Sequence, residues 1–222
     1  MKRILLLITC LSWPVSSLLA SEIGDPDRGM RLYPVCTACH GAQGAGNAAM
    51  KAPKIAGQMS WYVKRQMELF QQGARGTAPG DMQGMQMAAM AKGPQLKDPQ
   101  ALADLVAYIG TFPDQAPTPT VSGSVETGKQ LYVVCASCHG QKAEGIESMA
   151  GPRLAGQSDW YLLSSLQKFK QGQRGYHATD HGGRQMRGMV ATLTTDQAMR
   201  DVVVYINTCL LYTSDAADEH SW

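Results

Sequence analysis

Two short groups of cysteine and histidine carry the most specific chemistry in this 222-residue sequence. Each group has the form Cys-x-x-Cys-His, and the second copy follows the first at a distance of 99 residues. The members are Cys36, Cys39, His40, Cys135, Cys138 and His139. Two thiols at this spacing can add to the two vinyl groups of one porphyrin, and the adjacent histidine can bind the iron. Because this pattern is typical of c-type haem attachment, we predict two haems c, one at each group.

Three other uses of paired cysteines fit the sequence less well. A structural zinc site usually has its Cys-x-x-Cys pairs about 15–20 residues apart, whereas these pairs are 99 residues apart. A thioredoxin-like redox pair is expected in a βαβ setting, and the sequence shows no alternating strand pattern. Disulfides are compatible with an oxidising compartment, but they do not explain why a histidine follows the second cysteine twice.

Both groups belong to a longer internal repeat. Residues 29–90 and 128–189 align without a gap, and 26 of these 62 positions are identical. Further along, the offset between the copies falls to 97, so the first copy contains two extra residues around positions 92–95. The repeat predicts two similar domains that follow one another along the chain.

The segment between the copies, residues 113–124, is rich in proline, threonine and serine and is predicted to be an exposed linker. We therefore expect a first domain over residues 21–112 and a second over residues 125–208. Each of them has fewer than 100 residues.

The two ends of the chain differ from the repeat. Residues 1–20 are predicted to be a signal peptide, because two basic residues precede a short apolar run and a stretch of small residues. Residues 209–222 have no counterpart in the repeat and resemble a translated sequencing adapter, so we predict a non-native tail and assign Cys209 no function.

A signal peptide predicts export across the inner membrane to the periplasm, and a peripheral association with the membrane is compatible with the sequence. Residues 21–208 have a formal net charge of +3, without any block of basic residues. We therefore expect no nucleic acid among the partners.

Apolar residues recur at helical spacing near the end of each copy. These residues are Leu102, Leu105, Val106 and Ile109, and Met199, Val202, Val203 and Ile206. A helix is expected to run into each Cys-x-x-Cys-His group, and Ser60 and Asp159 are predicted N-caps of helices that start at Trp61 and Trp160. The glycine-rich stretch of residues 41–46 is predicted to be a loop. The fold class is therefore all-α.

The iron of an electron carrier usually has a sixth ligand, and Met/His ligation is typical of cytochromes c. The repeat preserves three pairs of methionines, namely Met50/Met149, Met87/Met186 and Met90/Met189. The first pair follows the histidine too closely to reach the opposite side of a haem, and of the other two pairs we prefer Met87 and Met186. His177 and His181 precede Met186 without a counterpart and would give bis-histidine ligation, although surface histidines are commoner in a polar loop.

The motifs in combination resemble the dihaem cytochrome c4 family, which consists of class I cytochrome c domains in tandem. Each copy has the Cys-x-x-Cys-His group, a Pro-[Lys/Arg]-[Ile/Leu]-Ala-Gly-Gln segment, an aromatic-led helix and a Phe-x-x-Gly-x-Arg-Gly turn. A Gln-Met-x-x-Met segment then precedes the last helix. The resemblance covers about residues 25–208 and implies two small helical domains, each wrapped around one covalently bound haem.

The resemblance also implies roles for individual residues. In the family the methionine ligand lies seven residues before a leucine, as Met186 does, whereas Met87 lies nine residues before Leu96. Met90 therefore remains a rival in the first domain. By the same resemblance, the carbonyls of Pro53 and Pro152 would accept a hydrogen bond from the haem-ligating histidines. Arg75 and Arg174 could pair with the haem propionates, with solvation at a helix end as an equal alternative.

The function that this resemblance implies is electron transfer, one electron at a time, without substrate chemistry. The donor would be a quinol–cytochrome c reductase and the acceptor a haem–copper terminal oxidase. One alternative is a dihaem peroxidase, which needs an iron with an open or displaceable position. Another is a haem subunit of a periplasmic dehydrogenase or oxidase complex.

Overall fold

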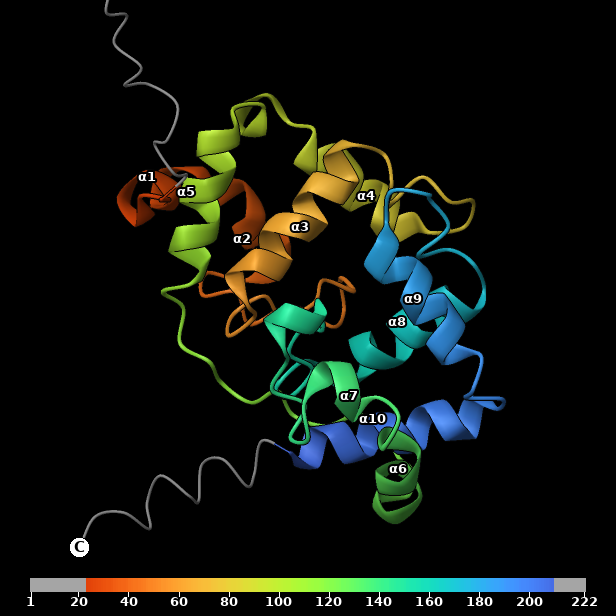
Figure 1. Cartoon of the computed structure of the whole chain (residues 1–222). Helices are drawn as coiled ribbons and strands as arrows, with labels where there is room; N and C mark the ends of the chain where they lie inside the picture. Colours follow the sequence, from red (N-terminus) through yellow and green to blue (C-terminus); the bar gives the residue numbers. More distant parts are fainter. Residues whose placement is uncertain (1–22, 210–222) are drawn as a thin grey trace, which may run out of the picture.

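The computed structural model describes residues 23–209, which form two helical domains in succession (Figure 1). The predicted signal peptide and residues 210–222 of the predicted tail lie outside the described residues. Within the described part, two isolated bridges, Asn47 with Ala52 and Ile146 with Gly151, are the only extended pairings. The predicted all-α fold class is therefore confirmed.

The order of helices is the same in both domains, as the repeat predicts. The first domain contains α1 (Pro26–Leu32), α2 (Pro34–His40), α3 (Ser60–Gln71), α4 (Met82–Ala91), the 3₁₀ turn η1 (Pro94–Leu96) and α5 (Pro99–Ile109). The second domain contains α6 (Val125–Tyr132), α7 (Ala136–His139), the 3₁₀ turn η2 (Glu147–Met149), α8 (Asp159–Lys170), α9 (His181–Val190) and α10 (Asp196–Thr208).

A helix does run into each Cys-x-x-Cys-His group, but it is a short helix of its own, whereas the sequence predicted that the first helix runs into the group. In the first domain only Tyr33 separates α1 from α2, and α2 begins at Pro34. Proline has no N–H to donate, so it suits the first position of a helix and disfavours an uninterrupted one. His40 and His139 are the last residues of α2 and α7, and Gly41, with φ of 81°, turns the chain out of α2.

The first and last helices of each domain cross at a glycine. A Cβ atom on Gly29 would lie 2.0 Å from the carbonyl oxygen of Asp104, so α1 contacts the backbone of α5 directly. A Cβ atom on Gly128 would lie equally close to the carbonyl oxygen of Asp201, where α6 crosses α10. Only glycine permits this approach, which brings the two ends of each domain together.

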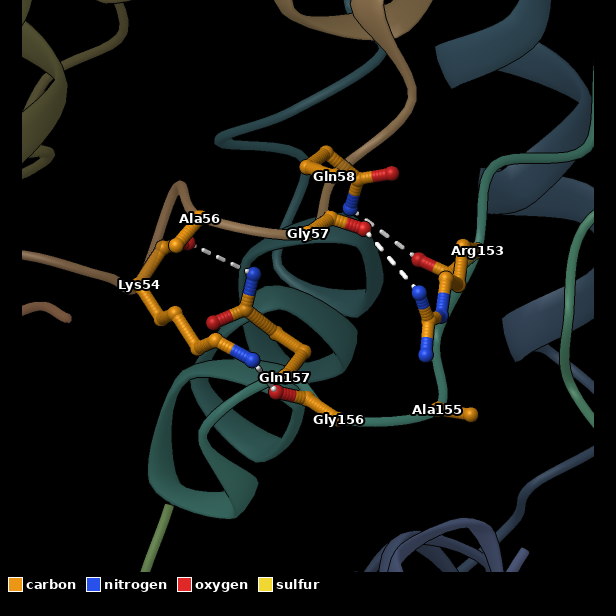
Figure 2. Close-up of a pocket in the computed structure, with 8 residues that line it drawn as sticks. All are labelled: Lys54, Ala56, Gly57, Gln58, Arg153, Ala155, Gly156 and Gln157. Atoms are coloured by element: carbon orange, nitrogen blue, oxygen red, sulfur yellow. Dashed lines mark hydrogen bonds between the residues drawn. The ribbon is translucent and has the colours of Figure 1, made fainter. Parts of the chain in front are cut away.

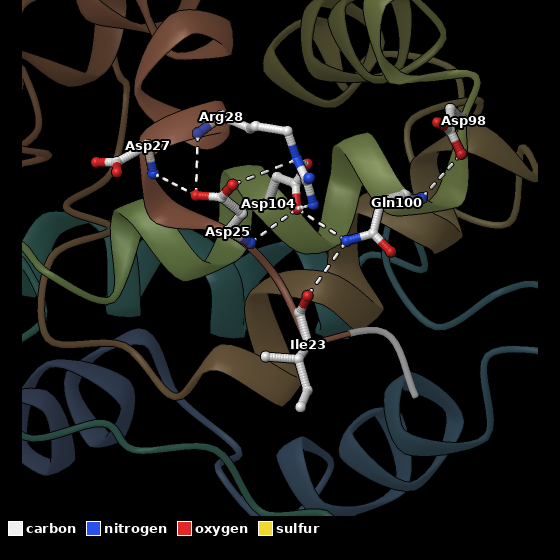
Figure 3. Close-up of polar contacts among 7 residues, drawn as sticks. All are labelled: Ile23, Asp25, Asp27, Arg28, Asp98, Gln100 and Asp104. Carbon is white, nitrogen blue, oxygen red and sulfur yellow. Dashed lines mark hydrogen bonds and ion pairs between the residues drawn. The ribbon is translucent and has the colours of Figure 1, made fainter. Parts of the chain in front are cut away.

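A buried carboxylate ties the start of α1 to α5 (Figure 3). Asp104 accepts hydrogen bonds from the backbone N–H of Asp25 at 2.8 Å, from Nε of Arg28 at 2.7 Å and from Gln100 at 2.8 Å. The hydrogen bond from Arg28, with help from the other donors and the guanidinium charge, holds the pKa of Asp104 well below its ordinary value. The carboxylate is therefore ionised in the folded domain.

The second domain has the same arrangement without the cation. Asp201 accepts hydrogen bonds from the backbone N–H of Ser124 at 2.8 Å and from the side chain of Gln197 at 2.8 Å. The counterpart of Arg28 is Thr127, which carries no charge. The carboxylate of the second domain is therefore held by neutral donors.

Two helices begin one residue earlier than predicted, and the predicted capping residues do not cap them. α3 begins at Ser60 and α8 at Asp159, and neither helix has a side-chain cap. The carboxylate of Asp159 instead accepts hydrogen bonds from the backbone N–H groups of Thr120 at 2.5 Å and Val121 at 2.6 Å. These N–H groups belong to the linker, so Asp159 fixes the linker against α8.

Cys209 lies at the end of α10, where it is buried. It belongs to the apolar core of the second domain, and its thiol donates to the carbonyl oxygen of Tyr205 at 3.6 Å. Cys209 therefore packs as part of the second domain.

Candidate haem sites

The two histidines of the Cys-x-x-Cys-His groups are buried, and a proline carbonyl orients each ring. Nδ1 of His40 lies 2.8 Å from the carbonyl oxygen of Pro53, and Nδ1 of His139 lies 2.7 Å from that of Pro152. A carbonyl can only accept, so Nδ1 carries the proton and Nε2 keeps its lone pair. Burial lowers the pKa of both histidines, although the hydrogen bond raises it in part. The neutral ring, with Nε2 free, is the form that binds iron.

The four cysteines are half-buried free thiols on or next to the short helices that end in these histidines. Burial and, to a smaller extent, the neighbouring Cys39 raise the pKa of Cys36 to about 11. Burial and Cys138 likewise raise the pKa of Cys135. Both groups therefore present two reduced sulfurs beside a neutral imidazole, which is the donor set that a covalent haem requires.

The methionines of the repeat differ in exposure. Met87 on α4 and Met186 on α9 are half-buried and pack against the apolar cores of their domains. By contrast, Met90 is 42% exposed and Met189 is 40% exposed. The third pair, Met50 and Met149, is also exposed.

In each domain the first cysteine of the Cys-x-x-Cys-His group and the half-buried methionine pack on the apolar core. In the second domain Cys135 and Met186 pack against one cluster of buried residues. In the first domain Cys36 and Met87 pack against two clusters, and Met67 contacts both. Both domains thus combine apolar surface with a histidine and a methionine, as a haem bound through both sides of its iron requires.

The insertion in the first copy does not displace the leucine that follows the methionine. The two extra residues are taken up where η1 forms, and Leu96 is buried there. Leu193, the counterpart in the second domain, is buried as well. The helix that carries Met87 is therefore followed by the same buried leucine as the helix that carries Met186, although the spacing differs.

Arg75 and Arg174 occupy equivalent positions with similar surroundings. The guanidinium of Arg75 lies 4.4 Å from the centre of the Phe70 ring, and that of Arg174 lies 4.3 Å from the Phe169 ring. Stacking of this kind holds a guanidinium flat while its N–H groups stay available to acceptors.

Two buried nitrogens of the described side chains have no hydrogen-bond partner, namely Nε1 of Trp61 and Nε of Arg75. An unpaired buried donor costs about 1–3 kcal/mol, and such atoms are rare in native proteins. Both are donors, so a carboxylate acceptor would satisfy them. The propionates of a haem supply such acceptors, and these residues therefore fit the cofactor.

At the centre of the interface between the domains lie reciprocal hydrogen bonds, which Figure 2 shows. Gln58 donates to the carbonyl oxygen of Arg153 at 3.0 Å, and Gln157 donates to that of Lys54 at 2.9 Å. Gln58 and Gln157 are counterparts in the repeat, as are Lys54 and Arg153. Because each of these two hydrogen bonds is matched by its equivalent, the centre of the interface has an approximate two-fold axis.

The charged ends of Lys54 and Arg153 extend the same pattern. Nζ of Lys54 donates to the carbonyl oxygen of Gly156 at 2.8 Å, and Arg153 donates to that of Gly57 at 3.3 Å. Asp114 of the linker forms ion pairs with both cations, with Arg153 at 2.8 Å. Lys54 and Arg153 follow Pro53 and Pro152 directly, so the interface lies one residue from each histidine-orienting carbonyl.

The two arginines near the haem sites also reach across the interface. Arg75 donates to the hydroxyl of Tyr161 at 3.1 Å, and Arg174 donates to that of Tyr62 at 3.3 Å. Burial raises the pKa of Tyr161, but the charges of Arg75 and Arg174, with the hydrogen bonds that Tyr161 receives, lower it overall. The sequence predicted a role for Arg75 and Arg174 but not these contacts.

The remaining candidates lie on the surface. His177 and His181 are both exposed, and Nδ1 of His177 lies 2.9 Å from the hydroxyl of Thr179. Within residues 23–209, no three side chains of the His, Cys, Asp or Glu type gather in a way that could hold a metal ion. None of the helices in this part of the chain has the length and apolar character needed to cross a membrane.

Known proteins match the chain along both domains. The Cytochrome c family matches residues 26–113 and again residues 125–209. Cytochrome c4 of Azotobacter vinelandii is 32% identical over 199 residues, which cover 85% of this chain and 90% of that protein. A thiosulfate dehydrogenase electron acceptor of Thiomonas intermedia is 33% identical over 148 residues, 63% of this chain and 64% of that protein. The crystal structure of reduced recombinant cytochrome c4 from Pseudomonas stutzeri has a TM-score of 0.62 at 26% identity and covers 82% of this chain and 97% of that chain.

Proposed function

The chain belongs to the cytochrome c family, as a dihaem electron carrier of the cytochrome c4 type with one haem c in each domain, and from this we propose which residues hold the haems and which partners exchange electrons with them. The haems are bound covalently by Cys36, Cys39, Cys135 and Cys138. His40 with Met87 would hold the iron of the first domain, and His139 with Met186 would hold the iron of the second.

The observation that carries this proposal is that both domains repeat the same ligand arrangement. His40 and His139 each donate Nδ1–H to a proline carbonyl, and a half-buried methionine packs on each core. When bound, a haem with both axial positions filled by protein supplies one-electron chemistry at its iron. With these residues in place, other ligands would be kept from both irons, which suits electron transfer and disfavours a peroxidase.

Exposure supports Met87 over Met90 as the ligand of the first domain. Met90 is 42% exposed, whereas Met87 packs against Phe70, Ala88 and Ala91. A thioether that binds iron inside a domain must be sheltered from water, and only Met87 of this pair is. Met186 is the equivalent residue of the second domain.

Pro53, Pro152, Arg75 and Arg174 support the haems from the surrounding protein. The proline carbonyls fix the proton on Nδ1 of each histidine and so strengthen the ligand at Nε2. The unpaired Nε of Arg75 and Nε1 of Trp61 would donate to propionate oxygens. Arg174 is buried at the equivalent position and would do the same in the second domain.

The chain would act in the periplasm, taking electrons from a quinol–cytochrome c reductase and passing them to a haem–copper terminal oxidase. The signal-peptide pattern of residues 1–20 and the resemblance to cytochrome c4 support this place in respiration. The partners would dock near the haem edges through weak contacts, since a shuttle must leave each partner after one transfer.

A second candidate partner is a thiosulfate dehydrogenase. One relative of this chain, 33% identical over 148 residues, is a thiosulfate dehydrogenase electron acceptor. The same pair of haems could serve this donor, because the reaction asked of the carrier is the same. The two candidates differ in the electron donor, which a transfer assay distinguishes.

Optical redox titration of the purified holoprotein tests the ligand assignment. We expect two haems per chain, both with the sulfur-to-iron charge-transfer band of Met ligation in the ferric state and neither binding carbon monoxide in the ferrous state. Met87→Ala and Met186→Ala should each remove half of the band, and Met90→Ala, the matched control, should leave it whole. Carbon monoxide binding to one haem of the wild-type protein would instead favour a peroxidase.

Rapid mixing with candidate donors tests the partners. The oxidised protein is mixed with a reduced quinol–cytochrome c reductase in one series and with thiosulfate dehydrogenase plus thiosulfate in another. The natural donor should reduce both haems with a rate that rises with its concentration. Equal and slow reduction by both donors would contradict both assignments.

A further inference from the structure

The helices that carry Met87 and Met186 begin in the same way. Asp81 is the N-cap of α4, and its carboxylate accepts a hydrogen bond from the backbone N–H of Gly84 at 3.0 Å. Asp180 is the N-cap of α9 and accepts one from Gly183 at 2.9 Å. Each methionine therefore follows a buried capping aspartate by six residues.

Within the part of the chain that the structure describes, only the cap of the first domain binds a cation from the other domain. Nζ of Lys168, on α8, lies 2.5 Å from Oδ1 of Asp81 and 3.2 Å from the side-chain oxygen of Gln83. The side chain of Asp81 is 2% exposed and that of Lys168 is 18% exposed. The N-terminus of α4 is therefore tied to the second domain by a largely desolvated ion pair.

The first domain has no equivalent side chain that could form such an ion pair with Asp180. The counterpart of Lys168 in the repeat is Leu69, which is buried, and the counterpart of Gln83 is Gly182, which has no side chain. Asp180 interacts electrostatically with Arg174, which belongs to the same domain. The interface thus departs from its two-fold symmetry at the helices that hold the two methionines.

One hydrogen bond links the first domain to the segment before α9, but it is weaker than the ion pair at the cap of α4. Arg65 of α3 donates to the carbonyl oxygen of Thr179 at 3.3 Å, before α9 begins. This hydrogen bond is exposed to water and is made to the backbone, so it holds α9 less firmly than an ion pair holds α4. A second contact on the side of α4 adds to the difference, since Gln173 donates to the carbonyl oxygen of Pro79 at 3.4 Å.

We propose that Lys168 of the second domain is a positioning residue for Met87, so that methionine ligation of the first haem depends on the docking of the two domains, whereas ligation of the second haem does not. This inference rests on the proposed role of Met87 as a ligand. α4 is a continuous helix of ten residues, and its cap lies less than two turns from Met87. A displacement of the cap therefore displaces the sulfur.

The protein itself indicates that the fold tolerates the loss of this contact. Asp180 caps α9 without an ammonium group from the other domain, and the helix forms nonetheless. The N-terminus of a helix also favours a carboxylate through its dipole. Replacing Lys168 should therefore loosen α4 at its cap rather than unfold the domain.

The test is the rate at which cyanide replaces the methionine in the ferric holoprotein, followed in the Soret band, with one kinetic phase for each haem. Met87→Ala and Met186→Ala first assign the phases, since each opens one iron to cyanide at once. The test variant is Lys168→Leu, which introduces the residue that the first copy has at this position. Lys168→Arg is the conservative variant, and Lys129→Leu on α6 is the control.

In Lys168→Leu we expect the phase of the first haem to become about tenfold faster, as loss of one hydrogen bond to a charged group predicts, and the phase of the second haem to stay unchanged. Lys168→Arg should restore the slow phase, and Lys129→Leu should behave as the wild type. Haem content of two per chain verifies that each variant is folded.

An unchanged first phase in Lys168→Leu would overturn the proposal, and so would equal acceleration of both phases, which would indicate general loosening. Failure of the ligand assignment has a different signature. In that case Met87→Ala would leave the charge-transfer band intact, whatever Lys168→Leu does.

Discussion

Asp114 of the linker should stabilise the docked arrangement of the domains, because it is the carboxylate that faces two cations from different domains. It forms ion pairs with Lys54 of the first domain and with Arg153 of the second. Asp114→Asn keeps the shape of the side chain and removes the charge. Lys54 would then face neutral acceptors only, namely the carbonyl oxygen of Gly156 and the amide oxygen of the new side chain.

The expected loss follows from the burial of these groups. The side chain of Lys54 is 3% exposed, whereas those of Asp114 and Arg153 are each 28% exposed. Removing one partner of a fully buried ion pair costs about 3–5 kcal/mol, and water screens part of this interaction because Asp114 is accessible. We therefore expect Asp114→Asn to lower the free energy of unfolding by about 2 kcal/mol, which corresponds to a fall in Tm of about 4–8 °C for a chain of this length.

Thermal unfolding of the holoprotein, followed by circular dichroism, measures this effect. Asp27→Asn, which changes an exposed carboxylate on α1, is the control and should stay within about 0.5 kcal/mol of the wild type. The double variant Lys54→Met with Asp114→Asn should regain much of the loss, since an apolar side chain then replaces an unpaired buried ammonium. An unchanged Tm in Asp114→Asn, or a double variant less stable than the single one, would refute the reasoning.

Two further predictions concern the first domain. Gly29→Ala places a Cβ 2.0 Å from a backbone oxygen and should lower the free energy of unfolding by about 2–3 kcal/mol in thermal unfolding. The control Gly188→Ala meets no atom within 4 Å and should stabilise α9 by up to about 1 kcal/mol; equal losses in both would contradict the steric argument. Asp104→Asn removes a carboxylate whose pKa is depressed by Arg28, and this stabilisation is present above the ordinary carboxyl pKa near 4 and disappears as the pH falls. The Tm difference from the wild type should therefore be large at pH 7 and shrink towards pH 2, and a constant difference would argue against it.

Several features of this protein could be predicted from local sequence because they depend on residues close together along the chain. Cys36, Cys39 and His40 lie on one turn of backbone, so their spacing alone predicts the kind of cofactor. The helical repeat of apolar residues in α5 and α10 predicts which face of each helix is buried. The family, the all-α fold and the haem c in each domain are confirmed.

The prediction from local sequence was wrong where a side chain binds a partner far away in the sequence instead of its neighbours. Asp159 has the residue type and position of an N-cap, but its carboxylate binds backbone N–H groups of the linker nearly forty residues away, at Thr120 and Val121. The helix that was expected to run into the first Cys-x-x-Cys-His group is divided at Pro34, since proline begins a helix more readily than it continues one.

The sequence by itself determined the cofactor class, the repeat and the order of helices, because each of these is encoded in spacing along a single copy. The tertiary structure decided which residues of one copy contact residues of the other. Lys168 and Asp81 are 87 residues apart, and their counterparts Leu69 and Asp180 form no such pair, so no comparison of the copies in sequence predicts the contact. The physical reason is that an ion pair depends on distance in space and on burial, and both are set only when the two domains pack together.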